Sequence, residues 1–243
     1  MSKILIIHPE DSSTKFLNKI KNNLLYKHNE LTHHFNIKPK ESSKIKCIET
    51  IQQYPKDSLI IFLGHGKSNS LYGSKGKYYD NKESISNDAI NENPHLYYYD
   101  ENFIDENNIE VFKNKNVFCL SCNSNGKIGN LAIESGAKTF LGFGDIPTSI
   151  SEFKEKYDYV SNDLVRYMKS EINYIIKRSL NICIHKNLTF EELNNYIVFI
   201  TNQRISEILI NQKKNAERCK LTNNLYFFKS QIKIFGDKNN KLF

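Results

Sequence analysis

The sequence predicts an α/β fold with a mostly parallel central sheet, and three observations lead to this prediction. Short, continuous apolar runs recur through residues 1–145, as expected of strands that are buried on both faces of a parallel sheet. Segments with apolar residues at three- and four-residue spacing separate several of these runs and are typical of amphipathic helices. The alternation of strands and helices implies right-handed crossovers between parallel strands.

Each element of this core is expected from a local pattern. Apolar runs predict strands, and apolar periodicity after a capping residue predicts a helix, with Asp11 or Ser12 as the first such cap. The expected strands are 3–8, 33–37, 59–64, 117–121 and 138–143. The expected helices follow Ser12, follow Ser43 as far as Pro55, and occupy 105–112 and 126–135.

Segment 67–102 is expected to be a long polar loop. It is rich in Ser, Asn, Gly and Lys, contains a tyrosine cluster, and has no clear periodicity. Loops of this length are usually functional or mobile. We therefore expect it to gate a neighbouring site, and to be ordered by a partner, by oligomerisation or by cleavage.

Residues 146–243 are expected to elaborate the core with helices and a closing strand. Ser149 and Thr189 each precede a Glu at capping-box spacing, and apolar periodicity predicts one long helix after each. Segment 225–235 alternates in polarity, which predicts the closing strand. Because no repeat or linker interrupts the chain, we expect a single domain, 1–243.

Composition limits the possible environments and partners. The formal charge is +7, but it comes almost entirely from lysines interspersed with acidic residues, so no nucleic-acid partner is expected. No apolar segment reaches the roughly 20 residues of a membrane span, and the first residues do not have the pattern of a signal peptide. Five scattered cysteines indicate a reducing compartment. We expect a cytoplasmic protein with no membrane partner.

Two apolar runs end abruptly in reactive side chains. LIIFLGHG (59–66) delivers His65 between two glycines, and NVFCLSCNSN (116–125) delivers Cys122 into a polar turn before an expected helix start. A parallel sheet presents its chemistry just beyond the carboxyl ends of its strands. His65 and Cys122 are therefore expected at one sheet edge, where an imidazole can activate a thiol.

Other assignments of these residues are weaker. Cys119 lies inside the apolar run and is best explained as a core residue, so Cys119 and Cys122 do not have the helix-opening placement of a redox motif. A zinc site would need two further ligands at metal-like spacing, and Cys183 with His185 is the only close pair elsewhere in the sequence. No phosphate-binding glycine motif follows the first strand. No cofactor or metal is expected.

The segments FLGHGKSNSLYG and FCLSCNSNGKIGNLAIESGAKTFLGF resemble the caspase-like cysteine peptidases of clan CD, and in particular the bacterial CHAT and gingipain-like branch. The resemblance covers residues 58–145, and IKIFGD (232–237) is similar to the ending of gingipain-like domains. His65 also precedes Cys122, as in the caspase pattern. The acidic residue that metacaspases have just before Ser-Cys is missing, since Leu120 stands there.

The resemblance implies a caspase-like fold and assigns a role to each site residue. Cys122 would be the nucleophile, and His65 the general acid that protonates the leaving amine. The backbone N–H groups of Gly66 and Cys122 would form the oxyanion hole. Asp145, beyond the fifth strand, is a candidate for the floor of a basic S1 pocket, although it serves equally well as a loop cap.

The expected function is therefore that of a cysteine endopeptidase (a hydrolase) with a His–Cys catalytic dyad, acting on a protein substrate. By family analogy it would belong to a regulated prokaryotic signalling or bacterial defence pathway, with an activating partner or an oligomer. The alternative is a catalytically inactive module of caspase fold that binds a partner or a small ligand as an adaptor.

Overall fold

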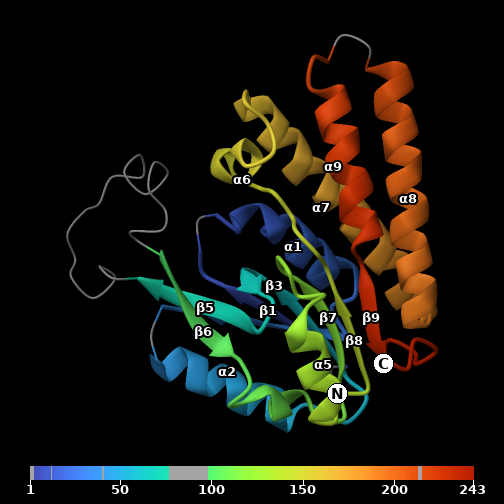
Figure 1. Ribbon diagram of the computed structural model, residues 1–243. Helices are drawn as coiled ribbons and strands as arrows, with labels where there is room; N and C mark the ends of the chain where they lie inside the picture. Colours follow the sequence, from blue (N-terminus) through green and yellow to red (C-terminus); the bar gives the residue numbers. More distant parts are fainter. Residues whose placement is uncertain (1–2, 12, 40, 77–97, 213–214) are drawn as a thin grey trace.

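A computed structural model describes residues 3–11, 13–39, 41–76, 98–212 and 215–243 of the chain (Figure 1). Its centre is a six-stranded sheet in the order β2-β1-β3-β7-β8-β9. The first five strands of that order are parallel, and β9 pairs antiparallel with β8. The strands are β1 (Ile4–Pro9), β2 (Thr32–Ile37), β3 (Leu59–Leu63), β7 (Asn116–Leu120), β8 (Thr139–Gly142) and β9 (Lys233–Gly236).

Helices cover both faces of this sheet, so the expected α/β fold with a mostly parallel sheet is confirmed. One face packs against α2 (Glu41–Gln53), α5 (Lys127–Glu134) and the 3-10 turn η2 (Ile109–Phe112). The other face shares one hydrophobic core with α1 (Asn18–Lys27), α7 (Asn162–Lys186), α8 (Phe190–Asn211) and α9 (Arg218–Ser230), in which α8 packs against α7 and α9. Figure 1 shows α8 and α9 side by side at one flank of the sheet.

Burial on both faces explains the continuous apolar runs. All residues of β3 are 0% exposed, and the odd and even positions of the strand enter two different cores. Leu59 and Ile61 face α1 and α7, whereas Ile60 and Phe62 face α2 and α5. Such a strand cannot show the polar alternation of a half-exposed strand.

The long helix expected after Ser149 is two helices. The capping box of Ser149 and Glu152 is present, but it opens only the short α6 (Ile150–Lys154). The chain then leaves the helical conformation until Ser161, whose hydroxyl accepts a hydrogen bond from Leu164 N and caps α7. A second N-cap inside an apolar periodicity therefore divides the segment.

The closing strand is shorter than expected, because α9 takes up most of segment 225–235. Leu221, Leu225 and Phe228 recur at helical spacing and are buried on one face of α9. Only Lys233–Gly236 form β9, which adds to the edge of the central sheet. The alternation predicted a strand over the whole segment, and the packing of α9 against the core prevails over residues 225–230.

The expected loop 67–102 begins and ends in a second, three-stranded sheet. It contains β4 (Gly66–Lys67), β5 (Ser70–Gly76) and β6 (Tyr98–Ile104), paired antiparallel. The expected gate at its centre, residues 77–97, lies outside the described residues. In the described parts of the chain, no helix combines the length and apolar character that a membrane span requires.

Candidate active site

His65 follows directly from the end of β3. The strand ends at Leu63, and the chain passes through Gly64 and His65 into the short β4. A Cβ on Gly64 would lie 3.1 Å from both the Phe62 ring and Pro9 Cδ. The glycine therefore lets the chain turn close to neighbouring side chains at the point where it presents His65.

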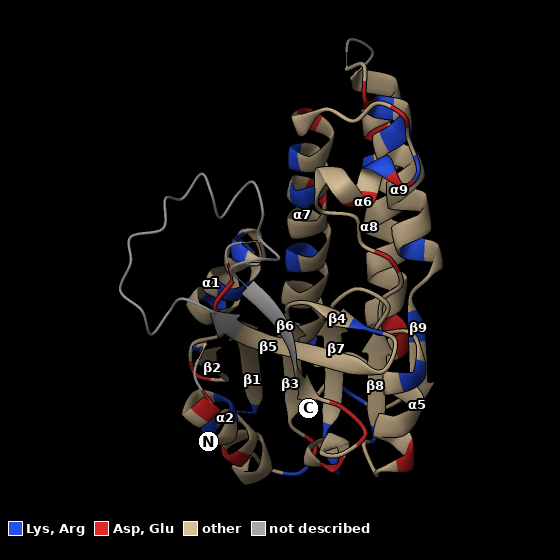
Figure 2. Cartoon of the chain, turned by 60° about the vertical axis from the view of Figure 1, so that its left-hand side comes forward, with Lys and Arg blue, Asp and Glu red and all other residues tan. Residues whose placement is uncertain are grey.

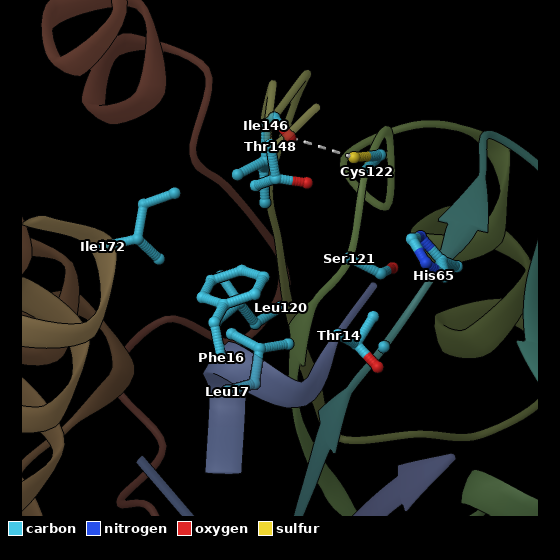
Figure 3. Close-up of a pocket in the computed structure, with 11 residues that line it drawn as sticks. Thr14, Phe16, Leu17, His65, Leu120, Ser121, Cys122, Ile146, Thr148 and Ile172 are labelled. Carbon is cyan, nitrogen blue, oxygen red and sulfur yellow. Dashed lines mark hydrogen bonds between the residues drawn. The ribbon is translucent and has the colours of Figure 1, made fainter. Parts of the chain in front are cut away.

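Cys122 occupies the equivalent place on the next strand. Leu63 and Leu120 are register partners in the parallel pair β3–β7, and His65 and Cys122 each lie two residues beyond them. Both side chains line one small pocket, shown in Figure 3, together with Thr14, Phe16, Ile146 and Ile172. The structure thus brings together the two residues that the sequence singled out.

The turn that carries Cys122 is fixed to the exit of β8. Asn123 adopts a left-handed conformation, with φ 55°, which Asn tolerates better than most residues. Its N–H donates to Gly144 O at 2.9 Å, while Ser124 Oγ accepts from Phe143 N at 2.9 Å. The Cys122 thiol itself donates to Ile146 O at 3.5 Å, the dashed line in Figure 3.

Cys119 and Cys122 have different surroundings, as the sequence predicted. Cys119 is 0% exposed, and its side chain is on the face of β7 opposite to that of Leu120. Its sulfur lies 3.4 Å from Ser121 Oγ. Burial raises the pKa of the Cys119 thiol to about 12, against the smaller opposing effect of the hydroxyls of Ser121 and Ser124. Cys119 is therefore a core thiol, whereas Cys122 is partly exposed at the pocket.

Asp11 holds the imidazole of His65 from a third strand end. It follows β1, the neighbour of β3, and its Oδ2 lies 2.8 Å from His65 Nε2. The Asp11 carboxylate also accepts hydrogen bonds from the N–H and the hydroxyl of Ser13, at 2.7 and 2.9 Å. Ser13 Oγ is in turn within hydrogen-bond distance of His65 Nε2.

These contacts keep Asp11 ionised although its side chain is only 8% exposed. Burial by itself raises the pKa of Asp11, but the His65 ring and the Ser13 donors outweigh burial and lower it below the usual value. An ionised carboxylate at Nε2 favours the tautomer that carries its proton there. The lone pair is then on Nδ1, which is the nitrogen able to accept a proton from a thiol or a substrate.

This role of Asp11 was not predicted from the sequence, which indicated only a helix cap. Asp11 does not cap α1, because the N-cap residue of that helix is Leu17. The Asp11 carboxylate instead accepts a hydrogen bond from the N–H of Ser13, two residues further along the chain. The signal that could have found it is the same one that found His65 and Cys122. Asp11 also follows an apolar run, and that run belongs to a strand adjacent to β3.

The expected oxyanion donors lie at the ends of β3 and β7. Tyr72 N donates to His65 O at 3.0 Å, so His65 and Tyr72 are a hydrogen-bonded pair beside the β4–β5 ladder. The next pair along the ladder is Gly66 and Leu71. Antiparallel pairs alternate between bonded and non-bonded positions, so the N–H of Gly66 is directed away from β5. A Cβ at Gly66 would lie 2.7 Å from Ser121 Oγ, which explains the absence of a side chain here.

The start of α5 binds the hairpin that follows His65. Its first N–H groups, on Lys127 and Ile128, donate to Ser68 Oγ at 3.1 Å and to Ser68 O at 2.6 Å. Ser68 lies in the turn between β4 and β5. The helix terminus therefore anchors the hairpin that follows His65.

Asp145 is not one of the described residues that line the pocket. Its carboxylate forms an ion pair with Lys156 at 2.5 Å, and its N–H donates to Gln231 Oε1 at 2.9 Å. A basic substrate side chain would have to displace Lys156 to reach it. The geometry therefore favours the loop-fixing role of Asp145 that the sequence left open.

Cys183 is buried within α7, and burial raises the pKa of its thiol to about 12. Among the described residues, no group of three or more His, Cys, Asp or Glu side chains is placed to hold a metal ion.

Comparisons of this chain with protein-family models, with curated proteins and with solved structures found no match.

Proposed function

We propose that this chain is a cysteine peptidase of the caspase-like kind, with Cys122 as nucleophile and His65 as its proton-transfer partner. The observation that carries the proposal is the meeting of three strand ends. Pocket-lining Cys122 and His65 follow adjacent parallel strands, and buried Asp11 binds the imidazole from the next strand. A nucleophile, a base and a group orienting the base are the equipment of covalent acyl transfer.

The proposed reaction has two balanced steps. The Cys122 sulfur attacks the peptide carbonyl carbon, and the N–H groups of Gly66 and Cys122 stabilise the oxyanion. His65 takes the proton of the Cys122 thiol and transfers it to the leaving amine as the C–N bond breaks, which leaves a thioester on Cys122. Water, deprotonated by His65, then cleaves the thioester and regenerates the thiol.

The pocket walls suggest what the substrate presents to this site. Phe16, Leu17, Ile146 and Ile172 contribute apolar surface around the dyad, with Thr14 and Thr148 as polar neighbours. An uncharged side chain fits these walls better than the basic P1 residue that Asp145 would have served. We therefore propose protein substrates that are cleaved next to an apolar or small residue.

The alternative, an inactive binding module of the same fold, is favoured by one observation. The Cys122 thiol donates to the carbonyl oxygen of Ile146, and this contact must break before the sulfur can attack. In an active enzyme it belongs to a resting state, whereas in a binding module it is permanent.

Cleavage of an unbiased peptide library distinguishes the two. The whole chain is incubated with the library, and cleavage sites are mapped by mass spectrometry for the wild type and for Cys122→Ala. Cys219→Ala is the matched control, because it removes an exposed thiol outside the pocket.

Cleavage that persists in Cys219→Ala and disappears in Cys122→Ala is the expected result. If the wild type and Cys122→Ala give the same peptides, Cys122 is not the nucleophile. A wild type that cleaves nothing, alone or after concentration to promote oligomers, would favour the binding module.

A further inference from the structure

A second pocket, with a cavity volume of about 400 Å³, opens between α1 and α7. Lys19 of α1 and Arg166 and Lys169 of α7 line it, together with Asn162, Ser170 and Asn173. Phe16 lines both this pocket and that of Cys122, so the two pockets are neighbours. The volume is within the range of small-molecule binding sites, about 300–1,000 Å³.

The pocket is positively charged. Figure 2 shows bands of Lys and Arg along α7 and on α1 beside it. Lys169 Nζ lies 5.3 Å from the centre of the Phe16 ring, and burial lowers the pKa of Lys169, against the opposing effects of Glu152 and Asp11. Asp163 pairs with Arg166 Nη2 at 2.9 Å, but a guanidinium has five N–H donors and can bind a second anion.

Asn173 adds an independent sign of a ligand. It is 6% exposed, and its Nδ2 donates to Lys169 O at 2.9 Å, which fixes the orientation of the amide. Its Oδ1 is buried and has no hydrogen-bond partner among the described residues. A buried acceptor without a donor is costly, so a ligand that brings an O–H or N–H group here would satisfy it.

We propose that this pocket binds a small phosphorylated, hydroxyl-bearing molecule. Its phosphate would be held by Lys169, Arg166 and Lys19, and one of its hydroxyls would donate to Asn173 Oδ1. A phosphate monoester carries a charge of about −1.5 to −2 near neutral pH. It therefore balances the charge of three cations better than a carboxylate, which carries a single negative charge. The site lies outside the proposed catalytic pocket and does not depend on the peptidase proposal.

Isothermal titration calorimetry with the whole chain tests this assignment, with ribose 5-phosphate as the probe. Ribose and inorganic phosphate separate the contributions of the hydroxyls and of the anion. The variants are Lys169→Gln and Asn173→Leu, with Lys177→Gln as control because it removes the same charge from the same helix outside the pocket. Thermal unfolding establishes that each variant folds, and Lys19→Gln replaces Lys169→Gln if the latter does not.

We expect saturable binding of ribose 5-phosphate by the wild type and by Lys177→Gln, weakened at least tenfold in Lys169→Gln. Asn173→Leu should weaken ribose 5-phosphate and leave inorganic phosphate unchanged, and ribose alone should not bind. The proposal is overturned if ribose 5-phosphate does not saturate the wild type. It is also overturned if Lys177→Gln loses as much affinity as Lys169→Gln, or if Asn173→Leu binds both probes as the wild type does.

Discussion

At the scale of single residues, the site depends on three side chains with different tasks. In the proposed reaction Cys122 would supply the sulfur and His65 the proton transfer, and Asp11 would orient the imidazole through its 2.8 Å contact with Nε2. His65 and Cys122 could be predicted because each ends a strongly apolar run in an unusual residue. Asp11 also follows an apolar run, but Asp near a helix start is common, so the sequence favoured an ordinary helix cap.

Asp11→Asn should lower kcat of the proposed peptidase about tenfold or more, because an uncharged amide no longer favours the tautomer with its proton on Nε2. The pH profile of kcat should change, while KM and the thermal unfolding temperature change little. Asp145→Asn is the control, because it removes a carboxylate outside the pocket. Equal pH profiles for Asp11→Asn and the wild type would show that Asp11 only packs against His65.

The two neighbouring cysteines should respond oppositely to substitution by Ala. Cys119→Ala should lower the free energy of unfolding by roughly 1 kcal/mol, since it leaves a small cavity in the core, and should retain activity. Cys122→Ala should change stability by less than about 0.5 kcal/mol and abolish activity. Urea unfolding and peptide cleavage measure both effects, and an inactive, well-folded Cys119→Ala beside an active Cys122→Ala would reverse the assignment.

At the scale of secondary-structure elements, the hairpin after His65 connects the ends of β3 and β7. Ser68 binds the start of α5, and Gly66 lies against Ser121. The parallel strands could be predicted from the sequence because burial on both faces leaves a continuous apolar run. Strands β4, β5 and β6 could not be predicted, because their short, polar segments pair with each other at a distance along the chain and no local pattern indicates that pairing.

Gly66→Ala should reduce activity, because its Cβ would lie 2.7 Å from Ser121 Oγ and 3.0 Å from Ser70 O and would push the hairpin away from β7. The double variant Gly66→Ala/Ser121→Ala should recover part of the activity, since it removes the nearer obstacle. Gly73→Ala is the control in β5, where the nearest atoms are 3.3 Å away and include the flexible Lys44 side chain. No recovery in the double variant would mean that the loss has another cause, such as a change in the N–H of Gly66.

At the scale of the whole molecule, two cores on opposite faces of one sheet hold the strand ends in place. The break between α6 and α7 could not be predicted because the second N-cap, Ser161, lies within a continuous apolar periodicity. The helical start of segment 225–235 could not be predicted because its apolar residues fit both a strand and a helix, and packing against the core decides between the two. The same packing buries titratable groups, and this makes the stability of the fold depend on pH.

His8 should make the fold less stable in mild acid. It is 3% exposed in β1, and burial lowers its pKa from 6.5 to about 4, against the opposing effect of the Thr14 carbonyl. Below pH 6.5 the unfolded chain takes up this proton and the folded chain does not, so stability is lost as the pH falls towards 4. The loss at about pH 4.5 is on the order of 2 kcal/mol, and the similarly lowered pKa of His34 adds to it.

Urea unfolding at about pH 7.5 and pH 4.5 measures this dependence in the wild type and in His8→Gln, which keeps a donor for Thr14 O but does not titrate. His8→Gln should lose less stability between the two pH values than the wild type. Parallel losses in the two proteins would assign the acid sensitivity to other groups.

The proposed pairing of His65 with Cys122 is tested most directly by the rate at which iodoacetamide alkylates each cysteine, followed by peptide mass spectrometry. Exposed Cys219 serves as an internal reference in the same sample, and Cys47, Cys119 and Cys183 are buried. An imidazole beside a thiol promotes the reactive thiolate. Cys122 should therefore react faster than Cys219 at about pH 6 although it is less exposed, and His65→Ala should remove that advantage without changing Cys219. A Cys122 that reacts more slowly than Cys219 at every pH, with the same rate in His65→Ala, would contradict the account.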